Sequence, residues 1–290
     1  MSATLHNDTE LAINAVELAT ATGFHHSNWF FVPDALYAGD DGTWNCADRH
    51  FDQANAASAG GVLFAQSTQS PHEIQKFPDG VAIVIPPHSK IVATTHLLDA
   101  GDAPLDVPLS ITITPIADVT TRLAALSFEN VGIALPPHRV SKFTTECDVG
   151  TQSMNLTGSA PDFNIYYGLA HYHALGTALS LEAVASDGTS TMVYETQNRI
   201  GDTLGGQIAP AFSMQGYSKL RLSCTYNNDR DATVGWGVGD QEMCVVLAFT
   251  DSQFVWGGGV INNDGPGTSV DTGTEVDFTH ACSLITTPVN

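Results

Sequence analysis

Two histidines stand two residues apart in an otherwise apolar run. The run is GLAHYHALG, residues 168–176, and the histidines are His171 and His173. On a β-strand, residues i and i+2 point to the same face of the sheet, so the two imidazoles would lie side by side. Neutral imidazole is the commonest metal ligand in proteins. The pattern therefore indicates either a metal site or the exposed polar face of an edge strand.

Histidines also gather in the first half of the chain. His25 and His26 are adjacent in GFHHSNWFF, and His96 ends the apolar run IVATTH. Adjacent strand residues face opposite sides of a sheet, so His25 and His26 can share one ion only where the strand bulges or twists. The alternative for His96 is a hydrogen-bonded residue at the rim of the core.

One methionine belongs with these histidines. Met243 lies in GDQEMC, directly after the glycine-rich segment GWGVG. A thioether is a soft ligand, and soft ligands select copper(I). Methionine is also a common filler of apolar cores, so Met243 alone leaves both interpretations open.

Two of these segments together resemble a known enzyme family. HYHALG and, about 70 residues later, CTYNNDRDATVGWGVGDQEMC strongly resemble the second catalytic domain of the type II copper, ascorbate-dependent monooxygenases. That family includes peptidylglycine α-hydroxylating monooxygenase and dopamine β-monooxygenase. The matching positions are His171, His173, Gly176, Cys224, Glu242, Met243 and Cys244.

The resemblance extends into the first half of the chain. FPDGVAIVIPPHSKIVATTHLLD looks like the family's stretch leading to a third histidine, and LPPHRVSKFTTEC looks like its entry into the second domain. The likeness is strong over residues 134–250 and weak over 1–80 and 251–290.

The resemblance implies two copper ions per chain, with ascorbate as reductant and with O₂ and a small molecule as substrates. An electron-supplying copper would be held by His25, His26 and His96. The copper that binds O₂ and faces the substrate would be held by His171, His173 and Met243, which would be the catalytic set. Both ligand sets suit an ion that cycles between copper(I) and copper(II).

The chain has five cysteines and no CxxC pair, which argues against a zinc knuckle or a thioredoxin-like site. The resemblance pairs Cys224 with Cys244 and Cys147 with Cys282, and it leaves Cys46 without the family's partner. Disulfides form in oxidising compartments, so we expect a secreted or periplasmic protein. The alternative is a set of buried free thiols.

The chain departs from the family where the peptide-amidating members bind substrate. Their arginine two residues before the His-x-His motif, which grips a carboxylate, is Leu169 here, and their asparagine and tyrosine after Met-Cys are Val245 and Leu247. No charged clamp for a carboxylate remains. With Tyr167 nearby, these residues predict an apolar substrate pocket, and simple core packing is the alternative.

Most of the chain is typical of strands separated by turns. The expected strands lie at 80–98, broken by Pro86-Pro87, at 108–117, at 181–197 with a turn at Asp187-Gly188, at 219–228 and at 242–250. A weak helical pattern covers 51–58. This pattern predicts an all-β fold of two consecutive antiparallel β-sandwich (jelly-roll-like) domains, residues 1–136 and 137–290. A faint repeat, Pro-Pro-His followed by a strand, appears in 84–99 and again in 134–149.

The formal net charge of −21 argues against nucleic acid or an anionic membrane surface as a partner. No run of 18 apolar residues occurs, so we expect no membrane span. The resemblance makes a copper monooxygenase that hydroxylates an aliphatic carbon of a small or apolar substrate the leading hypothesis. The alternatives are a secreted copper-binding β-sandwich without turnover and a carbohydrate-binding or structural β-sandwich protein. The sequence leaves the oligomeric state open.

Overall fold

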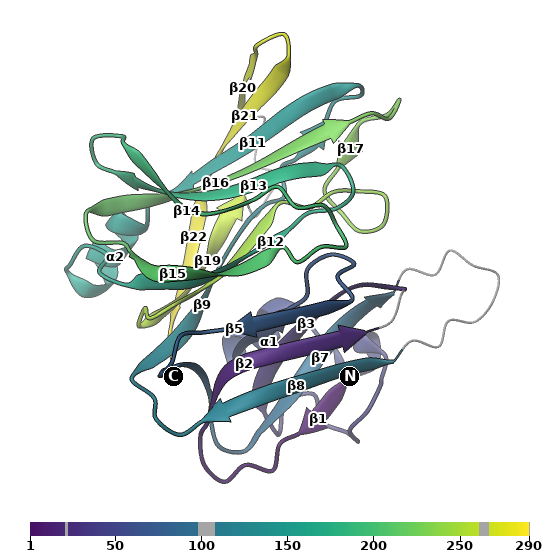
Figure 1. Cartoon of the computed structure of the whole chain (residues 1–290), viewed down its shortest axis with the longest axis vertical. Helices are drawn as coiled ribbons and strands as arrows, with labels where there is room; N and C mark the ends of the chain where they lie inside the picture. The colour runs from purple at the N-terminus through teal and green to yellow at the C-terminus, as the bar shows by residue number, and fades with distance from the viewer. Residues whose placement is uncertain (21–22, 98–107, 261–266, 290) are drawn as a thin grey trace, which may run out of the picture. The chain divides into compact units, whose positions relative to one another are not determined.

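The computed structural model describes residues 1–20, 23–97, 108–260 and 267–289, and it is almost entirely β (Figure 1). The chain divides into two compact units, Met1–Ala125 and Leu126–Asn290. Two α-helices are described, α1 (Gln53–Ala59) and α2 (Val149–Thr157). The predicted all-β sandwich class is confirmed.

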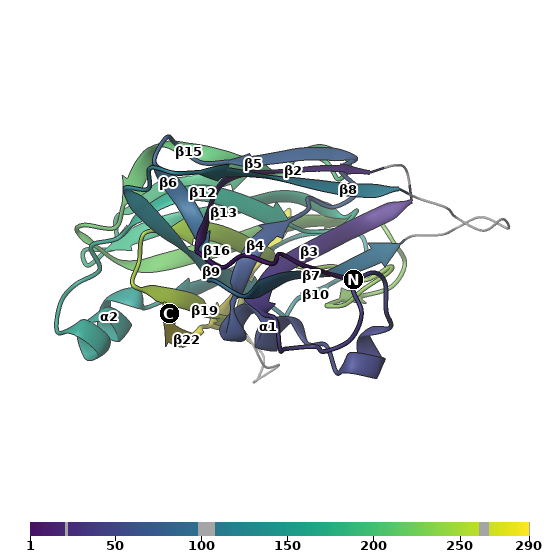
Figure 2. The ribbon, with the colours of Figure 1, turned by 90° about the horizontal axis from the view of Figure 1, so that it is seen from below.

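The first unit consists of two layers of strands, visible from below in Figure 2. One sheet has the order β1 (Ser2–Thr4), β7 (Ser89–Leu97), β3 (Phe24–Pro33), β4 (Gly61–Ala65). In the other layer, strand β2 pairs with β5, β6 and β8, whose bounds are Leu11–Thr20 (β2), His72–Lys76 (β5), Val81–Ile85 (β6) and Leu109–Ile116 (β8). Helix α1 packs on β3 and β4.

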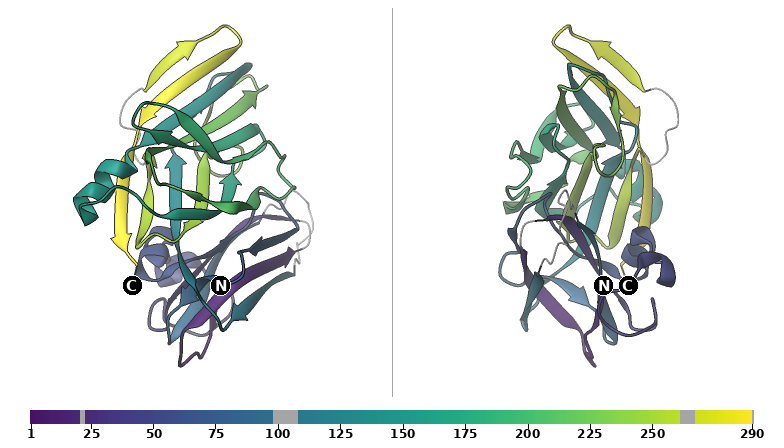
Figure 3. Two further views of the ribbon diagram at one scale, coloured as in Figure 1. Left: turned by 60° about the vertical axis from the view of Figure 1, so that its left-hand side comes forward. Right: turned by 90° about the vertical axis from the view of Figure 1, so that its right-hand side faces the viewer.

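The second unit is a sandwich of two sheets around one large apolar core. One sheet runs β14 (Ser190–Thr196), β13 (Gly176–Ala185), β16 (Tyr217–Asn228), β11 (Arg139–Cys147), β21 (Glu275–Ala281), β20 (Thr268–Asp271). The facing sheet contains β15 (Gly205–Ser213), β12 (Asn164–His171), β18 (Val245–Thr250), β9 (Thr121–Asn130), β19 (Phe254–Val260) and β22 (Ser283–Pro288). The short strands β10 (Ala134–Leu135) and β17 (Val234–Gly235) pair with each other, and the β20–β21 hairpin extends the first sheet at its edge (Figure 3).

The division between the units falls inside strand β9. Residues 121–123 pair in parallel with β6 of the first unit, and residues 126–130 pair in parallel with β19 of the second. The boundary predicted after residue 136 comes later in the chain, because the Pro-Pro-His turn that suggested it follows β9 rather than separating the units. Most pairs are antiparallel, as predicted, and β11–β21 is a further parallel pair.

The faint repeat is a real structural recurrence. His88 and His138 each follow a Pro-Pro pair, and each adopts a left-handed backbone, with φ of 56° and 54°. Strands β7 and β11 begin directly after them. The same turn therefore starts a strand once in each unit.

Several local predictions are confirmed. The break at Pro86-Pro87 separates β6 from β7, the turn containing Gly188 (φ 88°) joins β13 to β14, and the weak helical pattern corresponds to α1. Helix α2 was not predicted. Its boundary signals are present, since the Asp148 side chain accepts a hydrogen bond from the Thr151 N–H at 2.7 Å and Gly158 ends the helix in a left-handed conformation.

Both expected disulfides are present, Cys147–Cys282 and Cys224–Cys244, and both lie in the second unit. The alternative of buried free thiols is therefore wrong for these four residues. Cys46 is an exposed free thiol. Two disulfides indicate an oxidising compartment. None of the helices among the described residues is long and apolar enough to cross a membrane.

Candidate metal centres

A β-bulge brings His25 and His26 toward one another. Along β3, Phe24 is opposite Leu97 and His26 is opposite His96, so the register shifts by one residue at His25. The bulge that the adjacent histidines required is therefore present. It lets consecutive residues approach a common side, because an extra residue interrupts the strict alternation of the strand.

The three imidazoles of the first unit form a compact cluster. The ring centroids of His26 and His96 lie 4.4 Å apart, and those of His25 and His26 lie 5.3 Å apart, with the ring planes nearly perpendicular in both pairs. His26 is buried, and burial lowers the pKa of His96, which favours the neutral ring that binds metals.

In the second unit, β12 carries one histidine and the turn after it carries the other. His171 is the last residue of the strand, and His173 follows in the turn. Their ring centroids are 5.2 Å apart, with perpendicular ring planes. The predicted side-by-side imidazoles are therefore present, although the strand itself ends at His171.

These ring separations can be compared with metal geometry. Two imidazoles bound to one ion through bonds of about 2.0–2.1 Å place their ring centroids roughly 4.5–5.2 Å apart for bond angles of about 90–110°. The His171–His173 separation of 5.2 Å lies within that range, and the 4.4 Å and 5.3 Å separations of the first cluster lie just outside its two ends. Nevertheless, no group of three or more His, Cys, Asp or Glu side chains in the described part of the chain is arranged to hold a metal ion.

A backbone contact sets the tautomer of His173. Its Nδ1 atom lies 2.7 Å from the Gln241 carbonyl oxygen. Because a carbonyl only accepts, neutral His173 carries its proton on Nδ1 and its lone pair on Nε2. Metal-binding histidines are typically oriented by such a contact from the other ring nitrogen.

Glu242 joins the histidine turn to the methionine segment. One carboxylate oxygen accepts the His173 N–H at 2.8 Å, and the other accepts the Leu175 N–H at 2.7 Å. The side chain is 1% exposed, and burial raises its pKa against the opposing effect of these hydrogen bonds. The sequence motif contains Glu242, but its role as a clamp was not predicted, since the contact spans 69 residues.

The neighbouring Met243 is held from two further sides. The Tyr226 hydroxyl donates to the Met243 carbonyl oxygen at 2.6 Å, and the next residue, Cys244, is tied to Cys224 on β16. The structure thus brings the segment that carries Met243 against the turn that carries His173. Gln241 and Glu242, before the methionine, contact His173, and Cys244, after it, is bonded to β16.

The four residues predicted to line a substrate pocket share one face of the sheet. Leu169 is opposite Leu247, and His171 is opposite Val245, on the adjacent strands β12 and β18. The intervening Ala170 and Val246 point the other way, into the core of the second unit. Tyr167, Leu169 and Leu247 are buried and Val245 is half-buried, so an apolar row on this face leads to His171. The face carries no replacement for the missing arginine at these four positions.

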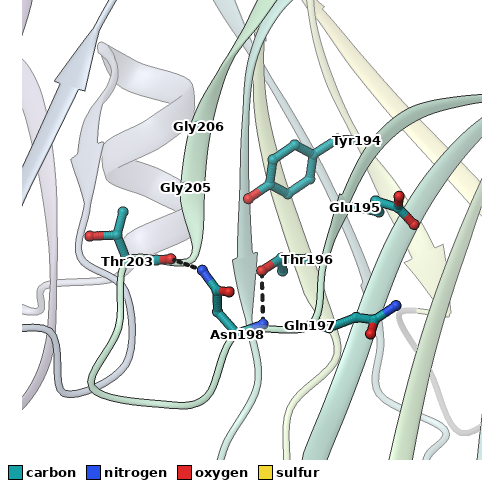
Figure 4. Close-up of a pocket in the computed structure, with 8 residues that line it drawn as sticks. All are labelled: Tyr194, Glu195, Thr196, Gln197, Asn198, Thr203, Gly205 and Gly206. Atoms are coloured by element: carbon teal, nitrogen blue, oxygen red, sulfur yellow. Dashed lines mark hydrogen bonds between the residues drawn. The ribbon is translucent and has the colours of Figure 1, made fainter.

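A pocket that the sequence did not indicate lies where β14 ends and β15 begins (Figure 4). Its volume is about 410 Å³. The Tyr172 hydroxyl donates to the Asn198 carbonyl oxygen, and the Asn198 side-chain amide donates to the Thr203 carbonyl oxygen at 2.9 Å. None of the predicted ligands lines it; the lining residues are Tyr194, Glu195, Thr196, Gln197, Asn198, Thr203, Gly205 and Gly206.

Comparisons with known proteins do not assign a family. No family model matches the chain, and no curated protein matches it. Among solved structures, the chain aligns with the infectious bursal disease virus Gx strain at 10% identity and a TM-score of 0.23, over 84% of this chain and 57% of that one. It aligns with the VP2 subviral particle of the same virus at 11% identity and a TM-score of 0.25, over 85% of this chain and 58% of that one. It also aligns with a protein of Parabacteroides distasonis described as secreted (11%, 0.22, 86% and 76%). The chain spans less than two thirds of the viral chains, and TM-scores this low bear on neither its fold nor its function.

Proposed function

We propose that the protein is a copper-dependent monooxygenase that hydroxylates an aliphatic C–H bond of a small or apolar substrate. One observation carries the proposal. His173 and the segment of Met243 are joined by the Glu242 carboxylate and the Gln241 carbonyl, although they lie about 70 residues apart. Two imidazoles and a soft thioether together make a donor set that suits copper(I).

The first imidazole cluster supports the same proposal. The rings of His25 and His96 lie 5.3 Å and 4.4 Å from that of His26, close to the spacing of imidazoles that share an ion. Three neutral imidazoles suit a copper that passes electrons, since imidazole binds both of its common oxidation states. The two clusters belong to different units, so the proposal has one copper in each.

The overall reaction defines what must be supplied. One oxygen atom of O₂ enters the C–H bond as a hydroxyl group and the other leaves as water, which consumes two electrons and two protons. Two molecules of a one-electron reductant such as ascorbate provide both. Copper, when bound, would supply O₂ activation and electron transfer. The chain's own residues would orient the rings and, at Leu169, Val245 and Leu247, present an apolar wall to the substrate.

The side chains on this face of the sheet bear on the polarity of the substrate. The wall that approaches His171 contains apolar side chains at the three positions where a carboxylate-binding enzyme would need charged or polar ones. We therefore propose a small or apolar substrate rather than a glycine-extended peptide. The two disulfides fit a secreted or periplasmic location for the enzyme.

The first test is copper content after reconstitution and desalting. We expect about two ions per chain, and about one after either Met243→Ala or His96→Ala. Met154→Ala and His72→Ala are matched controls, because both side chains are exposed and lie outside the clusters. A parent protein that binds no copper would refute the proposal.

The competing function is copper binding without turnover. It is favoured by the loss of the family's charged carboxylate clamp, whose positions are occupied here by Leu169, Val245 and Leu247. Oxygen uptake with ascorbate and a panel of small apolar substrates separates the two functions. Copper binding without any substrate-dependent uptake would support the non-catalytic alternative.

A further inference from the structure

A second buried carboxylate lies in the first unit, away from every predicted ligand. Glu73 on β5 is 1% exposed, and burial raises the pKa of its carboxyl to about 6. Both of its oxygens accept hydrogen bonds from one residue, the Ser67 N–H at 2.6 Å and the Ser67 hydroxyl at 2.7 Å. A buried carboxyl is costly unless its oxygens accept hydrogen bonds, and Ser67 supplies two of them. The contact therefore holds the loop that carries Ser67 against β5.

That loop lies along the strand that carries the histidines. Strand β4 pairs with β3 as far as Asn28, and the chain then continues beside β3 through two further backbone bonds. The Gln66 N–H donates to the Ser27 carbonyl at 2.8 Å, and the Gln69 N–H donates to the His25 carbonyl at 2.6 Å. The Ser27 hydroxyl in turn donates to the Gln66 side chain at 2.9 Å. The loop thus binds the backbone on both sides of His26.

The contact at His25 falls on the bulge. His25 is the extra residue of β3, at the position where the register with β7 shifts. The Gln69 N–H binds its carbonyl from the opposite side of the strand. Holding that carbonyl fixes the direction in which His25 and His26 leave the strand, because the peptide orientation determines the direction of the side chains that flank it.

We infer that Glu73 is a positioning residue for the imidazole cluster, acting through Ser67 and the 66–70 loop. The second unit has the same arrangement in simpler form, since Glu242 binds the backbone of His173 directly. Each histidine pair is thereby supported by a buried carboxylate from elsewhere in its own unit. The prediction for copper affinity rests on the proposed function, whereas the prediction for the loop does not.

The loop is tested first without metal, by backbone amide hydrogen exchange. Glu73→Leu removes both acceptors at similar side-chain size, and we expect faster exchange at Gln69 and Gln66 by about tenfold or more. Glu73→Gln should restore slow exchange, because its carbonyl can accept from the Ser67 N–H while its amide donates to the Ser67 hydroxyl. Glu17→Gln, an exposed carboxylate on neighbouring β2, is the control. Unchanged exchange in Glu73→Leu would overturn the inference.

Copper affinity is the readout that a merely structural role does not move. In a Met243→Ala background only the first cluster should bind copper, and Glu73→Leu should weaken that binding about tenfold or more, with rescue by Glu73→Gln. In a His96→Ala background the same substitution should leave the second site unchanged. Equal weakening at both sites, or none at the first, would overturn the positioning role. If the parent binds no copper, the proposed function fails, and the exchange rates of Gln69 and Gln66 alone decide the inference.

Discussion

The two disulfides allow a quantitative prediction, because they close loops of very different length within one unit. Cys224–Cys244 spans 20 residues, and Cys147–Cys282 spans 135. The chain-entropy relation gives about 3 kcal/mol of stabilisation for the short loop and about 5 kcal/mol for the long one. Replacing each pair by alanines should therefore lower the free energy of unfolding of the second unit by these amounts, the long loop by more.

The measurement is urea unfolding of the parent and the two double variants, followed by near-ultraviolet circular dichroism.

Copper(I) binding at the second cluster should be affected in the opposite order, more by loss of the short loop than by loss of the long one. Removal of Cys224–Cys244 frees the residue next to Met243 and should weaken binding, whereas removal of Cys147–Cys282 should leave it near the parent value. A larger stability loss from the short loop would refute the entropic reasoning. Equal copper binding in both variants would refute the role of Cys244 in holding Met243.

Two further predictions concern the buried carboxylates. Burial raises the pKa of Glu73 from 4.5 to about 6, so its contribution to stability is complete below about pH 4.5 and is lost as the pH rises through about 6; this loss amounts to about 2 kcal/mol. Glu73→Gln should remove that part of the pH dependence, measured by urea unfolding at pH 4.5 and 7.5, and an unchanged pH dependence would contradict the assigned shift. Glu242→Ala should lower the free energy of unfolding by about 2–5 kcal/mol, because it leaves the buried N–H groups of His173 and Leu175 without their acceptor. The control is Glu146→Ala, which removes partly exposed ion pairs with Lys219 and Arg221 and should lower the free energy of unfolding by about 1 kcal/mol or less. Equal decreases in the two variants would count against the role of Glu242 as a clamp.

Local pattern located several strands, among them β6, β7, β8, β16 and β18. Alternation and turn residues predicted the β6–β7 break at Pro86-Pro87 and the hairpin around Gly188, because both depend on the backbone preferences of a few neighbouring residues. Resemblance to a copper monooxygenase motif predicted both disulfide pairs, which spacing alone leaves open. Helix α2 escaped prediction because its nine residues carry only a weak apolar stripe, although Asp148 and Gly158 bound it.

The sequence by itself determined which side chains are available: two histidine pairs, one further histidine near the end of a strand, and a methionine beside a cysteine. Only the tertiary structure decided how they meet. The bulge at His25 places His26 opposite His96, and Glu242 joins the turn of His173 to the segment of Met243. Glu73 reaches the first cluster through a loop that no local signal connects to it. Strand propensity and turns depend on neighbouring residues, whereas these contacts arise from the packing of segments that are distant in the chain.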